Sequence, residues 1–356
     1  MMKQKIAMCM LAGVLVFGMG GCGTQEVEVP EVKNVETAEE EPEQSDSEAA
    51  SEEVPAEEKS EAEEDPEQSD VEAASEEVPT VNDAAESEET EPEETEEASA
   101  PVVYEDGGQI PLDPSWTYAD HSKINSGAAV LYKAAENRKE IVVGVNAGHG
   151  TSGGTKVKTL CHPDGSAKVT GGTTAAGATE AVAVSSGMTF NDGTPESSVT
   201  LRMAQILKEK LLAAGYDVLM LRDGDDVQLD NVARTVICNN AADCHIALHW
   251  DGDGLNYDKG CFYISVPERL KSMEPVASHW SEHNALGSAL VEGLRAQGAK
   301  INGGGSMSID LTQTSYSTVP SVDMELGNAC SDHSDSALNL LGDGLVQGVN
   351  SYFGQS

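Results

Sequence analysis

The sequence predicts an α/β fold: a single wrapped domain with a mostly parallel central sheet flanked by helices, preceded by a disordered acidic spacer. From residue 140 onward, short unbroken apolar runs alternate with segments whose apolar residues recur at helical spacing. Strands that alternate with helices favour a parallel sheet with helices on its faces. Residues 23–100 are acidic and carry no aromatic residue, so they cannot bury enough apolar surface to fold.

Residues 1–22 have the features of an export signal. Two lysines precede an apolar core from Ile6 to Phe17, and Cys22 follows two glycines. The apolar run is shorter than the roughly 20 residues that a membrane span needs. A small-residue cleavage site that ends in cysteine resembles the bacterial lipobox, which implies that Cys22 carries a lipid anchor. The alternative is an ordinary cleaved signal in which Cys22 has no role.

Residues 23–100 are predicted to be a disordered linker with a duplicated segment. Between Glu26 and Glu97, 32 acidic residues stand against two lysines, which accounts for most of the formal net charge of −41. The segment PEQSDSEAASEEVP, which begins at Pro42, recurs at Pro66 with one substitution. Acidic copies without hydrophobic faces cannot stack into a solenoid, so the duplication indicates a spacer. The following residues, 101–139, are expected to form an extension that packs on the folded domain as a strand or short helix.

Composition excludes two classes of protein. A chain this negative is a poor candidate for binding nucleic acid, because neutralising phosphates requires a surface rich in Lys and Arg. Five cysteines follow Cys22, an odd number without a CxxC pair, so neither a disulfide framework nor a cysteine-rich zinc site is indicated.

Residues 140–356 contain the predicted folded domain. Helices are expected from Thr194 to Gly215, with Thr194 as the N-cap and Pro195 as the first helical residue, and at 229–242, 284–297 and 336–353. Strands are expected at 141–145, 216–221, 244–250, 261–266 and 319–326.

Four polar residues stand at the ends of these predicted elements. His149 follows the first strand, His249 ends the third, Glu325 ends the last, and Glu196 lies in the first turn of the first helix. The carboxyl ends of parallel strands form the edge at which open α/β sheets bind ligands. Taken singly, His149 could be a loop residue, and Glu196 could simply complement the helix dipole.

Two histidines and one carboxylate are a typical ligand set of a catalytic zinc site, in which water takes the fourth position. A separate carboxylate must then take the proton of that water and pass it to the leaving nitrogen. Glu325 is available for this second role.

Four blocks of sequence resemble the signature blocks of the zinc-dependent N-acetylmuramoyl-L-alanine amidases (family 3 type). NAGHG from Asn146, ESSVTLRMAQILKEKLLAAGYDVLMLRD from Glu196, RTVICNNAADCHIALHWD from Arg234 and PSVDMELGN from Pro320 match, in order, DAGHG, the ExxxxL helix, RxxxAN…D-x-FISIHAN and PAVLVExGF. The resemblance covers roughly residues 140–356. It implies Zn²⁺ as the cofactor and a catalytic domain built as a sheet flanked by helices.

Carried over residue by residue, the resemblance implies that His149, Glu196 and His249 bind zinc and that Glu325 is catalytic. The implied reaction is hydrolysis of the amide bond between N-acetylmuramic acid and L-alanine in peptidoglycan. The sequence departs from the blocks where Asn146 replaces Asp and where Trp250 begins the pair Trp-Asp in place of Ala-Asn. These departures bear on substrate details, since none removes a ligand.

The 46 residues between His149 and Glu196 form a long insertion rich in Gly, Thr and Ser. An insertion at the rim of a site is typical of a lid or a substrate loop. Within it, Glu180 is the alternative to Glu196 as the carboxylate ligand. Structural roles are expected for four other polar residues: His162, His245, Arg234 and Asp243, with Arg234 and Asp243 supporting the fold or the ligands.

The leading hypothesis is an amidase that works outside the cytoplasm, anchored by lipid at Cys22 to the bacterial membrane and facing the cell wall. Two alternatives remain: a non-catalytic wall-binding lipoprotein with an amidase fold, and a zinc peptidase that acts on stem peptides. The sequence leaves stem-peptide preference, protein partners and oligomeric state open.

Overall fold

The computed structural model describes residues 104–355; Cys22, the export signal and the acidic linker lie outside this range. The predicted strands are present, with bounds that differ by a few residues: β3 (Val142–Ala147), β6 (Asp217–Met220), β7 (Cys244–Asp251), β8 (Cys261–Ser265) and β10 (Ser321–Asn328). The predicted helices are α1 (Glu196–Ala213), α2 (Asn231–Ala241), α3 (Val276–Ala296) and α5 (Asp335–Tyr352).

Other elements were not assigned from the sequence. They are β4 (Lys158–Leu160) and β5 (Glu180–Val182) in the insertion, β9 (Ile301–Ser308), α4 (Thr312–Tyr316), and the 3-10 helices Ala119–His121, Gly154–Lys156 and Glu268–Leu270. The segment before residue 140 contributes β1 (Gln109–Pro111) and β2 (Ala128–Tyr132). β2 pairs antiparallel with β6, so this segment extends the sheet at one edge.

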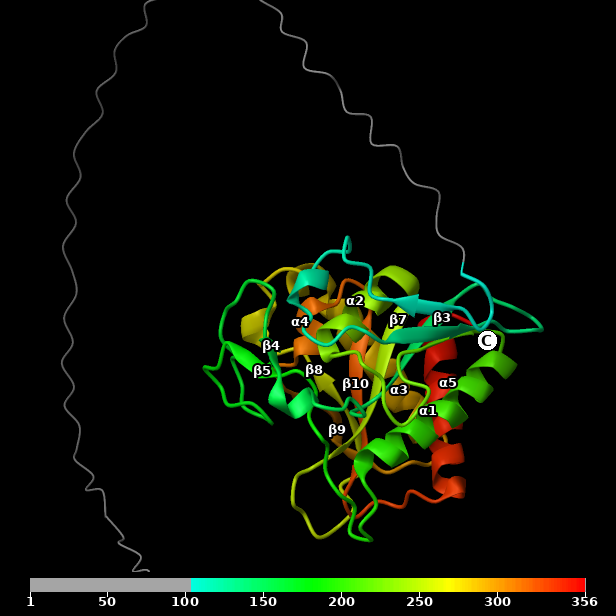
Figure 1. The fold of residues 1–356 in the computed structure, drawn as a ribbon. Helices are drawn as coiled ribbons and strands as arrows, with labels where there is room; N and C mark the ends of the chain where they lie inside the picture. Colours follow the sequence, from blue (N-terminus) through cyan, green and yellow to red (C-terminus); the bar gives the residue numbers. More distant parts are fainter. Residues whose placement is uncertain (1–103, 356) are drawn as a thin grey trace, which may run out of the picture. The chain divides into compact units, whose positions relative to one another are not determined.

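An eight-stranded sheet runs through the described part of the chain in the order β1-β2-β6-β3-β7-β10-β8-β9 (Figure 1). β6, β3, β7 and β10 form a continuous parallel centre, and β8 and β9 are parallel to each other. β8 runs antiparallel to β10. The α/β class with helices flanking a mostly parallel sheet is therefore confirmed.

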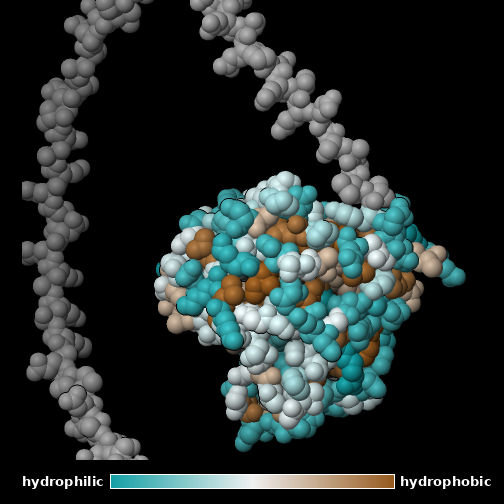
Figure 2. Space-filling view, viewed as in Figure 1, coloured by the Kyte–Doolittle hydropathy of each residue, from teal (hydrophilic) through white to brown (hydrophobic). Residues whose placement is uncertain are grey.

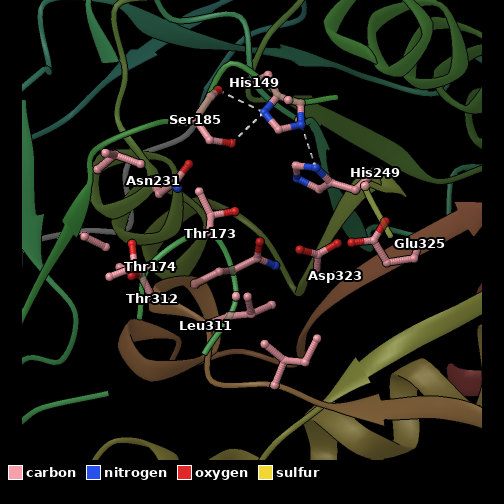
Figure 3. A pocket seen from close by; sticks show the side chains of 18 of the residues that line it. His149, Thr173, Thr174, Ser185, Asn231, His249, Leu311, Thr312, Asp323 and Glu325 are labelled. Carbon is pink, nitrogen blue, oxygen red and sulfur yellow. Dashed lines mark hydrogen bonds between the residues drawn. The ribbon is translucent and has the colours of Figure 1, made fainter. Parts of the chain in front are cut away.

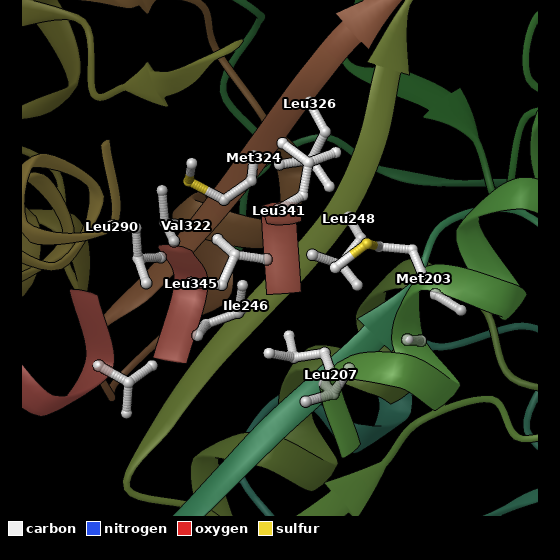
Figure 4. Close-up of a cluster of buried hydrophobic side chains, with 14 of the residues drawn as sticks. Met203, Leu207, Ile246, Leu248, Leu290, Val322, Met324, Leu326, Leu341 and Leu345 are labelled. Atoms are coloured by element: carbon white, nitrogen blue, oxygen red, sulfur yellow. The ribbon is translucent and has the colours of Figure 1, made fainter. Parts of the chain in front are cut away.

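The larger apolar core lies between one face of this sheet and the helices α1, α3 and α5. Two central strands contribute to this core: β7 with Ile246 and Leu248, and β10 with Val322 and Met324 (Figure 4). The helices contribute Met203 and Leu207 of α1, Leu290 of α3, and Leu341 and Leu345 of α5. Because side chains alternate along a strand, Ala247 and His249 face the opposite side of the sheet.

The predicted N-cap of α1 is wrong by one residue. The helix begins at Glu196, with Pro195 at the cap position and no side-chain hydrogen bond to the helix end. Thr194 instead accepts a backbone hydrogen bond from Phe190 and lies in the turn that precedes the helix. Glu196, rather than a cap residue, therefore stands at the start of α1.

The surface is mainly hydrophilic on the face shown in Figure 2, with hydrophobic side chains grouped between the polar ones. Among residues 104–355, Tyr257 and Leu340 are the large hydrophobic residues that are clearly exposed. No helix within this range combines the length and the apolar character required to cross a bilayer.

Candidate metal centre

The four predicted site residues meet at the carboxyl edge of the parallel strands. His149 follows β3, and Glu196 begins α1. His249 and Glu325 are direct partners in the pairing of β7 with β10. Neither residue ends its strand as expected, because β7 continues to Asp251 and β10 continues through an irregularity to Asn328.

Three of these side chains converge on one point. His149 Nε2 lies 2.9 Å from Glu196 Oε1, and His249 Nδ1 lies 3.2 Å from the same oxygen. The two ring nitrogens are 3.1 Å apart. Glu180, the alternative carboxylate, is exposed in β5 and does not join this cluster.

His149 is held in one orientation and one tautomer by its surroundings. Its Nδ1 lies 2.9 Å from the Ser185 carbonyl oxygen and 3.1 Å from Ser185 Oγ (Figure 3). Because the carbonyl oxygen can only accept, Nδ1 donates to it, and Nε2, which faces Glu196 and His249, is the nitrogen left for a metal ion. The His149 backbone has a φ of 64°, a conformation that non-glycine residues rarely adopt.

Two buried arginines fix the backbone around His149. Arg234 donates from its Nη1 to the carbonyl of Ala147 at 3.0 Å and from its Nη2 to that of His149 at 2.7 Å. Arg222 donates from its Nη2 to the carbonyl of Gly148 at 3.0 Å. Arg234 also donates to Asn146 Oδ1 at 2.9 Å. Asn146 stands where the block DAGHG has Asp, and its amide oxygen still provides a buried acceptor for the arginine. These bonds hold the loop in its uncommon conformation.

Two glycines leave room for the converging side chains. A Cβ at Gly148 would lie 2.3 Å from the ring of His249, well inside van der Waals contact. A Cβ at Gly187 would lie 2.7 Å from both Glu196 Oε2 and the ring of His149. The close approach of the three side chains therefore requires glycine at both positions.

The Glu196 carboxylate is buried but fully hydrogen-bonded. Oε1 accepts from the Trp250 N–H at 3.0 Å, and Oε2 accepts from the Met188 N–H at 2.8 Å. Burial favours the neutral acid, but the hydrogen bonds and charges of His149 and His249 outweigh it and hold the pKa of Glu196 well below its usual range. Glu196 is thus an anion in the pocket.

The surroundings of His249 favour positive charge. Burial opposes protonation, but the carboxylates of Asp323, Glu196 and Glu325 outweigh it and raise the pKa of His249 to about 10. Burial raises the pKa of Asp323 and of Glu325; repulsion by Glu196 adds to the effect at Asp323, and repulsion by Asp323 adds to it at Glu325. Within residues 104–355, Glu325 Oε2 has no hydrogen-bond partner. A cation placed here would meet acidic groups on several sides.

The residues present fit a zinc ion. In a tetrahedral site with bonds of about 2.0–2.1 Å, neighbouring ligand atoms lie about 3.3 Å apart, close to the separations within the triad. All three ligand atoms lie within 4.8 Å of one another. Two imidazoles and one carboxylate are also the donor types that catalytic zinc sites use, and a metal ion would take the place of the proton that the carboxylates favour on His249.

The triad opens into a pocket of about 470 Å³. The insertion forms part of its wall through Lys168, Thr173 and Thr174, and the segment 309–313 adds another part (Figure 3). A buried cluster joins the two segments, since the Asp310 carboxylate accepts from the Val169 N–H at 2.7 Å and lies 3.0 Å from His162 Nε2. His162 therefore has the structural role expected for it.

Several residues at this site escaped the sequence analysis. Ser185 contacts His149 through its backbone carbonyl, and because every residue has this group, the sequence could not indicate the contact. Asp310 belongs to no recognised block, and Arg222 lies near the end of the second block, whose pattern assigns it no role. Asp323 had a readable signal, since it lies two residues before Glu325 and shares its face of the strand.

Comparison with known proteins identifies the family. A family model of N-acetylmuramoyl-L-alanine amidases matches residues 143–341, more than half of the chain. The solved amidase Ami1 from Mycobacterium smegmatis is 19% identical and superposes with a TM-score of 0.51 over 62% of this chain and 100% of its own. The apo form of Ami1 from Mycobacterium abscessus is 21% identical, with a TM-score of 0.48 over 60% of this chain and 99% of its own.

No curated protein matches the sequence. At 19% identity the Mycobacterium smegmatis structure supports the fold, and the family model supports the activity. The matched range contains each of the four residues at the carboxyl edge of the sheet. The chain belongs to the N-acetylmuramoyl-L-alanine amidase family.

Proposed function

We propose that this amidase hydrolyses the bond between N-acetylmuramic acid and L-alanine with a zinc ion held by His149, Glu196 and His249, and with Glu325 as general base. The observation that carries the proposal is the convergence of three ligand atoms, from three distant chain segments, within 4.8 Å of one another. The pairing of Glu325 with His249 across adjacent strands supports the second role.

A bound zinc ion polarises the scissile carbonyl and lowers the pKa of water toward neutrality. The chain supplies the other functions. His149 and His249 would present ring nitrogens to the metal, which would displace the proton that the neighbouring carboxylates favour on His249, and Ser185 orients His149. Glu325 takes the proton of the attacking water and delivers it to the amide nitrogen, so that L-alanine leaves with a free amino group.

Peptidoglycan is the substrate, so the enzyme works outside the cytoplasm. We further propose that residues 140–356 are the catalytic domain, that residues 23–100 are a spacer, and that a lipid on Cys22 holds the chain at the membrane.

The test uses the full chain, stripped of metal with a chelator and then reloaded with zinc. Incubated with peptidoglycan, the reloaded enzyme is expected to release fragments with N-terminal alanine, and the stripped enzyme is not. Cleavage within stem peptides, detected by mass spectrometry, would point to a peptidase instead. Equal release with and without metal would overturn the zinc mechanism.

A further inference from the structure

The insertion carries a serine and a histidine that form a hydrogen-bonded line with Asp310. Ser166 Oγ lies 2.8 Å from His162 Nδ1, and His162 Nε2 lies 3.0 Å and 3.1 Å from the two carboxylate oxygens of Asp310. His162 and Asp310 are fully buried, whereas Ser166 is exposed and does not line the pocket of the proposed zinc site. Hydrolases activate a hydroxyl group with this arrangement, in which a base contacts the nucleophile and a third group orients the base.

The charges around His162 leave the imidazole with one proton, which lies on Nε2. Asp310 is already paired with the buried ammonium group of Lys168, whose Nζ lies 3.7 Å from Oδ1. A second cation, on His162, would carry a buried charge without a counterion, so the ring is neutral. Because a carboxylate can only accept, the ring proton lies on Nε2, and Nδ1 keeps a lone pair for the hydroxyl group of Ser166.

The turn from His162 to Ser166 fixes the position of this hydroxyl group. The Gly165 N–H donates to the carbonyl of His162 at 3.1 Å, and the φ of Gly165 is 74°, a conformation that favours glycine. The Ser166 N–H donates to Asp164 Oδ1 at 2.9 Å. Met273 Sδ, at 3.7 Å from Ser166 Oγ, is a second acceptor for the hydroxyl group. A thioether accepts more weakly than an imidazole nitrogen, so the hydroxyl group donates to His162.

The surroundings of Ser166 suit an acyl group. Met273, Val169 and Trp280 are partly buried and pack on a small apolar cluster, so an apolar surface lies beside the hydroxyl group. Ala167, the next residue, is exposed, and no described residue accepts a hydrogen bond from its N–H. The N–H that follows a nucleophile is a common donor to the oxyanion of an acyl-transfer reaction.

We propose that Ser166 is the nucleophile of a second, metal-independent site that hydrolyses carboxylic esters with short apolar acyl groups. Ser166 Oγ forms a bond to the ester carbonyl carbon, and its proton passes to His162 Nδ1. The ester C–O bond then breaks, and the alkoxide takes that proton and leaves as the alcohol. Water, deprotonated by the same Nδ1, releases the acid and restores Ser166. Esters are expected rather than amides, because an alkoxide leaves more readily than an amide nitrogen.

Two probes test the proposal on the full chain. A fluorophosphonate forms a Ser Oγ–P bond with loss of fluoride, and p-nitrophenyl butyrate releases coloured nitrophenol. We expect one label per chain, located on Ser166 by mass spectrometry, and butyrate hydrolysis that persists after a chelator removes bound metal. Ser166→Ala should lower both signals by about 100-fold or more and leave peptidoglycan cleavage unchanged. The proposed amidase reaction is therefore measured separately on the same samples.

Asp310→Asn tests whether Asp310 positions the base. The amide group that this substitution introduces can donate to Nε2, which places the ring proton on Nδ1 and blocks the base. Labelling should slow by about 100- to 10,000-fold at pH 7. Its rate should also rise in proportion to hydroxide concentration, whereas labelling of the unaltered chain should level off above neutral pH. A variant whose rate still levels off would overturn the positioning role, since lost stability alone leaves the base in place.

Ser115→Ala is the matched control. Ser115 is also exposed and donates its hydroxyl group to the Asp113 carboxylate at 2.7 Å, but no described histidine hydrogen-bonds to it. This variant should keep both signals. Labelling that is absent, that spreads over other serines or that survives Ser166→Ala would overturn the proposal. Butyrate hydrolysis that disappears with the metal would also overturn it, because the reaction would then belong to the proposed zinc site.

Discussion

At the residue scale, the candidate site depends on groups that orient the three proposed ligands. Ser185 fixes the tautomer of His149, and Arg222 and Arg234 hold the carbonyls of the loop that carries it. Gly148 admits the ring of His249. These contacts orient the rings of His149 and His249, so their nitrogen atoms are in position before a metal binds.

Glu325→Gln is expected to reduce the turnover rate by about 100- to 10,000-fold, because the amide keeps the shape of the side chain but cannot accept the proton of the attacking water. Release of N-terminal alanine measures the rate. Zinc content, measured on the same sample, should stay the same as in the unaltered enzyme. A variant that keeps most of its activity would remove Glu325 from the mechanism.

Arg234→Met is expected to lower both stability and zinc affinity. The free energy of unfolding should fall by roughly 2–4 kcal/mol, because the buried carbonyls of Ala147 and His149 lose their donor. Zinc affinity should fall by about 10- to 100-fold. Chemical unfolding and metal titration measure the two effects.

Arg138→Met is the control for this variant. Arg138 pairs with Asp217 away from the pocket, so its loss should lower stability without weakening zinc binding. Equal zinc affinity in all three proteins would show that Arg234 does not support the ligands.

At the element scale, the predictable parts of the fold are those with a strong local pattern. The apolar run of β7 and the spacing of Val199, Met203 and Leu207 on α1 were sufficient to predict both elements. β9 was missed because three consecutive glycines in Ile301–Ser308 remove the apolar alternation and the β propensity on which a strand prediction depends. It forms nevertheless because β8 supplies a pairing partner.

The same contrast holds within the site. The positions of His149 after β3 and of Glu196 at the start of α1 could be predicted from clear periods, and His249 was assigned to the correct strand, although β7 continues two residues beyond it. The joining of His162 to Asp310, which are 148 positions apart, could not be predicted, because neither residue lies in a recognisable motif. Long-range polar pairs depend on the folded chain and leave no local pattern.

The pairing of Asp310 with the insertion predicts a pH-dependent stability. Burial opposes ionisation, but hydrogen bonds from His162 and the Val169 N–H, together with Lys168, outweigh it and lower the pKa of Asp310. A carboxyl group with a lowered folded-state pKa stabilises the fold above its unfolded pKa of about 3.9, and this contribution is lost as the pH falls through the folded value.

Asp310→Asn should therefore lower the free energy of unfolding at pH 7 by roughly 1–3 kcal/mol. The difference from the unaltered protein should shrink as the pH is lowered below 4. Urea unfolding of metal-free protein at several pH values measures this difference without interference from zinc release. A difference that stays constant with pH would show that the charge of Asp310 is not what joins the two segments.

At the scale of the whole molecule, the chain combines an acidic N-terminal stretch with an amidase fold. The acidic residues are concentrated before residue 98, whereas the described residues form an eight-stranded sheet with helices on its faces. We propose that the N-terminal stretch anchors the protein and that the folded part carries out the hydrolysis.

Cys22→Ala is expected to release the protein from the membrane fraction, because the proposed lipid anchor is attached through this thiol. Detergent phase partitioning of the full chain, expressed in a bacterium that acylates lipoproteins, measures the change. Activity on peptidoglycan in solution should be unaltered. If the variant and the unaltered chain partition alike, Cys22 is not the anchor.

The most direct test of the central claim is a crystal structure of the zinc-loaded protein with anomalous scattering measured at the zinc edge. The account predicts one strong peak within bonding distance of His149 Nε2, His249 Nδ1 and a carboxylate oxygen of Glu196, with Glu325 facing the open side. A peak elsewhere, or a peak that lacks any one of these three ligands, would contradict it.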